Sequence, residues 1–94
     1  MPKLTPAEID IALLELPSWK LEDGKLIRDF TFSDFVAAML FVNQVAALAE
    51  TANHHPDIDI RYNQVRLGLV SHDSGGITKR DVSLAGRIDK GLSA

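Results

Sequence analysis

The chain has 94 residues, enough for one hydrophobic core, so we expect a single domain that spans residues 1–94. Hydrophobic residues make up 46% and charged residues 24% of the chain, which excludes a disordered polar segment and is ordinary for a folded soluble domain. The formal charge of −3, with basic residues scattered along the sequence, argues against direct nucleic-acid binding, and the lack of cysteine excludes disulfides, thiolate nucleophiles and cysteine zinc sites.

No segment of the sequence is expected to enter a membrane. The N-terminus does not contain the basic region and long apolar run of a secretory signal, since it reads M-P-K-L-T-P-A-E. The longest uninterrupted apolar run, residues 35–42, is too short to cross a bilayer. We therefore expect a cytoplasmic protein.

The first elements expected are a helix and a hairpin. Residues 5–8 read T-P-A-E, a capping box with proline at the first helical position, and predict a helix to about residue 14. Two strands are predicted at residues 19–21 and 25–32. The dipeptide Asp23-Gly24 between them supplies the positive φ angles of a tight hairpin turn.

A long helix and a second hairpin follow. Ser33 or Asp34 can cap the helix, whose apolar residues recur at helical spacing until residues 51–53. Residues 58–62 and 65–69 then alternate apolar and polar side chains, a pattern typical of half-buried strands.

The register of the second hairpin follows from its turn. If residues 63–64 form a two-residue loop, Tyr62 faces Val65, and extending this register outward places His55 opposite His72. Two histidines from distant positions are therefore predicted to become cross-strand neighbours.

The last element expected is a helix. A Gly75-Gly76 turn precedes residues 78–81, T-K-R-D, a second capping box that begins a helix through Ile88. The fold class predicted is α+β, a four-stranded antiparallel sheet with three helices packed on one face, in the order α-β-β-α-β-β-α.

All three histidines lie between residues 54 and 72. Histidine is the side chain whose unperturbed pKa lies nearest neutrality, so such a group suits proton transfer at cellular pH. After residue 50 the chain carries five acidic and six basic residues, a near balance that suits an uncharged or weakly charged ligand.

A longer pattern surrounds these histidines. It consists of Glu50, three residues, His54-His55-Pro56, five residues, Tyr62, nine residues, His72, eight residues and Asp81. In this spacing the chain resembles the pterin-4a-carbinolamine dehydratases. It departs from many members at Ile58, where an aromatic residue is common, and at Ser71, where threonine is common, and neither change removes a titratable group.

The resemblance implies a dehydratase, a lyase that eliminates water from 4a-hydroxytetrahydropterin to give quinonoid dihydropterin. This reaction recycles the cofactor of the aromatic amino acid hydroxylases. It needs an acid for the departing hydroxyl and a base for the ring-nitrogen proton, groups that contribute about 10²–10⁴-fold each when positioned, and it requires no metal or organic cofactor. Members of the family form dimers and tetramers, so a homodimer or homotetramer is expected.

The resemblance also assigns residues. His54 and His72 are expected to act as acid and base, His55 to bind the ring and support the proton transfers, and Glu50 to orient an imidazole. Asp81 is interpreted as a helix cap alone. The residues expected to bind the substrate are Asn53, His54, His55, Val70, Ser71, His72 and Asp73.

Two alternatives of other classes stay open. Three histidines and a carboxylate can form a zinc or iron site, although the adjacent His54 and His55 point to opposite sides of an extended chain. The other alternative is a protein-interaction module without catalysis, because animal members of the family bind and stabilise dimers of a homeodomain transcription factor.

Overall fold

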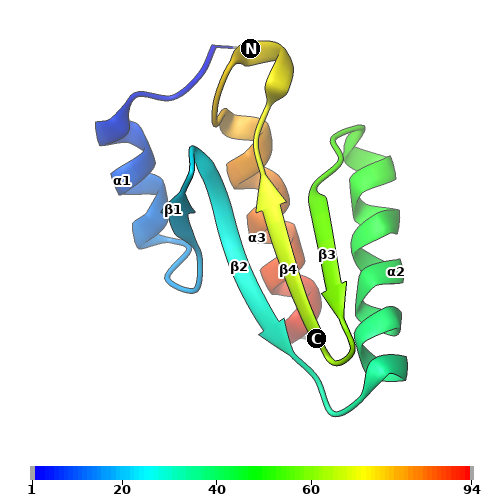
Figure 1. The fold of residues 1–94 in the computed structure, drawn as a ribbon. Helices are drawn as coiled ribbons and strands as arrows, with labels where there is room; N and C mark the ends of the chain where they lie inside the picture. Colours follow the sequence, from blue (N-terminus) through cyan, green and yellow to red (C-terminus); the bar gives the residue numbers. More distant parts are fainter. Residues whose placement is uncertain (1, 94) are drawn as a thin grey trace.

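The computed structural model describes residues 2–93, and its elements follow the predicted order (Figure 1). They are α1 (Pro6–Leu14), β1 (Lys20–Glu22), β2 (Lys25–Thr31), α2 (Phe35–Ala52), β3 (Asp57–Arg61), β4 (Gln64–Leu69), the 3₁₀ turn η1 (His72–Ser74) and α3 (Lys79–Ser93). The predicted α+β class is confirmed.

The four strands form one antiparallel sheet in the order β1-β2-β4-β3. Alternate residues of the two central strands, including Leu26, Phe30 and Leu67, join a core with residues of all three helices. Figure 1 shows α3 behind the strands, α2 along the β3 side and α1 beside β1. The helices thus cover one face of the sheet, and the other face stays open to solvent.

The first hairpin forms as predicted. Glu22 pairs with Lys25, and the two residues between them, Asp23 and Gly24, have φ angles of 51° and 74°. An aspartate–glycine pair tolerates these left-handed angles, which match the twist of the flanking strands.

The second hairpin differs from its predicted register. Arg61 pairs with Gln64, so the turn consists of Tyr62 and Asn63 rather than of residues 63–64. The prediction kept Tyr62 in the strand because residues 58–62 alternate apolar and polar side chains, yet its φ is 53°, an angle that bulky residues rarely adopt.

A contact with β2 explains this turn. The Asn63 side-chain nitrogen donates to the Phe32 carbonyl at 2.9 Å, and the Phe32 amide donates to the Asn63 carbonyl at 2.8 Å. Asn63 is therefore held at the end of the neighbouring strand, and the local sequence contains no sign of this long-range bond.

The change of register has two consequences. Because the pairing shifts by two residues, every side chain keeps its predicted face of the sheet. The predicted pair of His55 with His72 is wrong, because β3 begins only at Asp57 and β4 ends at Leu69.

Helix α2 is more apolar than the run of residues 35–42 indicated. Its 18 residues have a mean hydropathy of 1.5, and by length and composition alone it is long enough to cross a membrane, although 28% of it is buried in this structure. Its buried stripe, which includes Phe41 and Val45, packs in the core, whereas Val36 and Leu40 are 66% and 61% exposed.

Candidate functional site

The first part of the site is the end of α2. Asn53 adopts a left-handed conformation with φ 51°, and its amide donates to the carbonyls of Ala49 and Glu50. The His54 amide also donates to Ala49, at 3.0 Å. Asparagine tolerates this conformation better than most residues, so the chain leaves the helix here and carries His54 inward.

His54 meets a buried carboxylate at the start of α3. Its Nε2 lies 2.5 Å from Oδ1 of Asp81, and the two residues are 8% and 0% exposed. A carboxylate accepts hydrogen bonds, so a neutral imidazole that binds it through Nε2 carries its proton on that atom and leaves Nδ1 as an acceptor. Asp81 thereby selects one tautomer of His54.

The second oxygen of Asp81 is also satisfied. Oδ2 accepts from the Ser71 hydroxyl at 2.9 Å and from the Thr78 amide at 2.8 Å. The side-chain hydroxyls of Ser71 and Thr78 also lie 2.9 Å apart. Ser71 and Thr78 are 1% and 0% exposed. A carboxyl group this deeply buried is stable only when its hydrogen-bonding capacity is met, as it is here.

Asp81 therefore has a role that sequence reasoning missed. The predicted helix cap is present, but the same carboxylate links His54 to Ser71, the residue before His72. The capping box seemed a sufficient reason for Asp81, and only its fixed interval from His72 in the family pattern signalled more.

His55 occupies a different environment. Its Nε2 pairs with a Glu50 carboxylate oxygen, and the two side chains are 59% and 77% exposed. The supporting carboxylate expected from the sequence thus contacts an imidazole, but that imidazole belongs to His55 although Glu50 lies one helical turn before His54.

His72 is exposed and belongs to η1. Backbone bonds between Ser71 and Gly76, at 3.0 and 3.3 Å, close the loop around it. Its neighbour Asp73 accepts from an Arg80 guanidinium nitrogen at 2.6 Å, and this hydrogen bond lowers the pKa of Asp73. The loop is therefore anchored to α3 on both sides of His72.

The two predicted substrate-binding segments, residues 53–55 and 70–73, are thus joined through Asp81. In the second segment Val70 is half-buried, and the hydroxyl of Ser71 already belongs to the buried network. Within residues 2–93, no group of three or more His, Cys, Asp or Glu side chains is placed to hold a metal ion.

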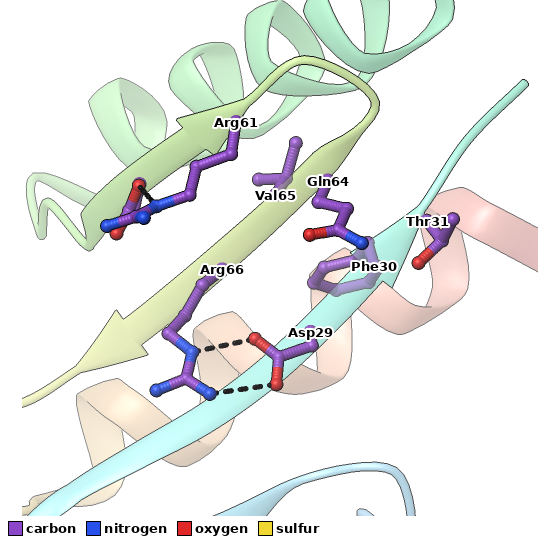
Figure 2. A pocket seen from close by; sticks show the side chains of 8 residues that line it. Asp29, Phe30, Thr31, Arg61, Gln64, Val65 and Arg66 are labelled. Carbon is purple, nitrogen blue, oxygen red and sulfur yellow. Dashed lines mark hydrogen bonds and ion pairs between the residues drawn. The ribbon is translucent and has the colours of Figure 1, made fainter. Parts of the chain in front are cut away.

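A separate depression of about 440 Å³ lies on the open face of the sheet (Figure 2). Its charged side chains bind one another: the Arg66 guanidinium donates to both carboxylate oxygens of Asp29 at 2.7 and 3.0 Å, and Arg61 donates to Asp59 at 3.3 Å. Its lining contains no histidine; it consists of Asp29, Phe30, Thr31, Asp59, Arg61, Gln64, Val65 and Arg66.

Comparisons with known proteins agree on one family. The family model described as Pterin 4 alpha carbinolamine dehydratase matches residues 2–91. A protein of Acidobacterium capsulatum, named as a predicted pterin-4-alpha-carbinolamine dehydratase, is 60% identical over 89 residues, which cover 95% of this chain and 97% of the relative. One of Chloroflexus aurantiacus with the same name is 53% identical over 90 residues, or 96% and 97% of the two chains.

Solved structures extend the comparison. A transcriptional coactivator/pterin dehydratase from Brucella melitensis has a TM-score of 0.88 and 36% identity, over 94% of this chain and 96% of that one. A pterin dehydratase-like protein identified as a RuBisCO assembly factor in the alpha-carboxysome has a TM-score of 0.66 and 25% identity, over 78% and 87%. With its fold and sequence matched over nearly its whole length, the chain belongs to the pterin-4-alpha-carbinolamine dehydratase family.

Proposed function

We propose that this protein eliminates water from 4a-hydroxytetrahydropterin to give quinonoid dihydropterin, by histidine acid/base catalysis. The observation that carries the proposal is the buried Asp81 carboxylate, which holds His54 on one oxygen and Ser71, next to His72, on the other. It joins the two segments to which we assign substrate binding.

The environments of the histidines suit different roles. Asp81 fixes Nε2–H of His54, so Nδ1 is the atom that takes up a substrate proton, and the carboxylate stabilises the imidazolium that forms. His72 is exposed on a short anchored turn and delivers the proton to the departing hydroxyl. For substrate bearing the hydroxyl on the opposite ring face, the two exchange roles.

The remaining residues bind and orient. His55, aligned by Glu50, contacts the pterin ring and supports the proton transfers. Asn53 and the loop of residues 70–73 complete the proposed pocket. The proposal includes a cytoplasmic location and a metabolic link to an aromatic amino acid hydroxylase, whose cofactor the reaction would regenerate.

A second copy of the chain is the proposed partner of α2. Phe35, Val36 and Leu40 are 48%, 66% and 61% exposed, and no charged side chain occurs between Asp34 and Glu50. A helix face this apolar is stabilised by burial against an equally apolar surface, and the same face of another copy supplies one.

The test follows the dehydration of freshly generated 4a-hydroxytetrahydropterin by absorbance, after metal removal. Wild type should exceed the spontaneous rate, and His54→Ala and His72→Ala should each lose about 10²-fold or more. Lys90→Gln, an exposed change late in α3, is the matched control and should keep the wild-type rate. No acceleration by folded wild type would overturn the proposal and favour the interaction module.

A further inference from the structure

A second concave region adjoins the buried side of His54. This cleft of about 440 Å³ lies between the end of α2 and the first turns of α3, and His54 forms part of its wall. The other polar side chains that line it are the cations Lys79, Arg80 and Arg87 and the hydroxyls Thr51 and Ser83. No carboxylate is among its described lining residues.

The cations of this cleft differ from those on the open sheet face. There, Arg66 is matched by Asp29, and Lys25 by Asp57 at 2.8 Å. Arg87 has no ion pair with any residue in the described range 2–93. In a chain of net charge −3, three cations around one cleft without a lining acid mark a local excess of positive charge.

The two remaining cations are only partly neutralised. Lys79 interacts electrostatically with Glu8, but the pKa of Glu8 is lowered most by a hydrogen bond from the Thr5 backbone, and the interaction with Lys79 is the smallest of the causes that lower it. Arg80 binds Asp73 through one terminal nitrogen, while its Nε is buried and has no hydrogen-bond partner. A buried N–H without an acceptor is costly, so the guanidinium of Arg80 keeps unused hydrogen-bonding capacity beside the cleft.

Arg80 also connects the cleft to the proposed active site. Its guanidinium lines the cleft and at the same time holds Asp73 in the loop that carries His72. The wall of the cleft therefore contains His54 and also Arg80, the residue that holds the loop of His72. Because His54 lines the cleft, a ligand whose ring lies beside His54 has the cleft next to it.

We propose that this cleft binds a phosphate group and, resting on the proposed function, that the preferred pterin substrate carries this phosphate on its side chain. Guanidinium and ammonium groups bind phosphate through charge-assisted hydrogen bonds, and the two hydroxyls add neutral donors. The near-neutral second half of the sequence suggested a weakly charged ligand. The fold instead places Lys79, Arg80 and Arg87 around one cleft that no carboxylate lines among the described residues.

The first experiment tests the cleft without any pterin. Amide chemical shifts of the ¹⁵N-labelled protein are followed while inorganic phosphate replaces chloride at constant ionic strength. Saturable shifts should appear at Thr51, Ser83 and Arg87, and Arg87→Gln should weaken binding about tenfold, the effect of losing one charge-assisted hydrogen bond. Lys90→Gln, on the same helix outside the cleft, should bind phosphate like wild type. Absence of saturable shifts would overturn the site.

The second experiment assigns the phosphate to a source. kcat/KM is compared for 4a-hydroxytetrahydropterins with and without a side-chain phosphate, and wild type should prefer the phosphorylated one. Arg87→Gln should reduce this preference about tenfold, whereas Lys90→Gln should preserve it. Equal use of both substrates would overturn the pterin assignment and leave a site for free phosphate. Phosphate binding without dehydration of either pterin would overturn the proposed function and leave the phosphate site standing.

Discussion

The open face of the sheet and the junction of α2 with α3 both consist of paired polar groups, but water reaches only one of them. The side chains of Arg66 and Asp29 on the open face are 46% and 54% exposed. At the junction, His54, Ser71, Thr78 and Asp81 are at most 8% exposed. Water can replace a lost partner on the open face but not at the junction. Removing one hydrogen-bond partner should therefore cost more stability at the junction.

The largest expected effect is that of Asp81→Ala. The substitution leaves the buried His54 ring, the Ser71 hydroxyl and the Thr78 amide without their acceptor. Removing one member of a buried charged network costs about 3–5 kcal/mol, a large part of the stability of a small domain. Urea unfolding monitored by circular dichroism measures the loss.

Asp59→Ala is the matched control on the open face. Asp59 is exposed, and its only described ion pair is with Arg61 at 3.3 Å. The free energy of unfolding should change by no more than about 0.5 kcal/mol. Similar losses in the Asp59 and Asp81 variants would contradict the contrast between the two regions.

Gly68→Val tests whether every position on the open face tolerates substitution without loss of stability. Gly68 pairs with Asp57, not with Asp59 as the predicted register had it, and a Cβ there would lie 3.2 Å from Cδ1 of Ile27. Valine should therefore crowd the one buried apolar residue of that face and cost about 1–3 kcal/mol in unfolding experiments.

Two variants sharpen the reading of Gly68. Adding Ile27→Ala to Gly68→Val removes the crowded side chain, so the double variant should lose less stability than the two separate losses together. Gly86→Ala, on α3, places its Cβ in open space and should be neutral or stabilising. Strict additivity of the first pair would show that the contact with Ile27 is not the cause.

Features of the fold that depend on residues close together in the chain could be predicted from the sequence. Capping patterns located the starts of all three helices, and the Asp23-Gly24 turn fixed the first hairpin. The second hairpin was misplaced because Asn63 bonds to Phe32, 31 positions away in the chain.

The site shows the same division between local and distant contacts. The spacing of the histidines indicated the family, but the bond between His54 and Asp81 depends on how α2 packs against α3. The cationic cleft depends on that packing too, since Lys79 and Arg87 lie two turns apart on α3 and meet Thr51 only in the fold.

The smallest expected effect concerns pH and the pair of Asp29 with Arg66. A hydrogen bond from Arg66 lowers the pKa of Asp29 in the folded protein, below the value of about 3.9 for an unfolded aspartate. A carboxyl with a lowered folded pKa adds stability above its unfolded pKa, and this part is lost as the pH falls through the folded value. Asp29→Asn cannot contribute it at any pH.

The difference in unfolding free energy between wild type and Asp29→Asn should therefore be constant near neutral pH and shrink as the pH falls below about 4. Because both side chains are half exposed, the difference should also shrink in high salt, whereas the loss caused by Asp81→Ala should not. A difference that persists in acid would mean that the Asp29 carboxylate contributes through its shape and packing. Exposure to solvent would then no longer explain why a charged pair on the open face contributes less to the free energy of unfolding than the pair at the buried junction.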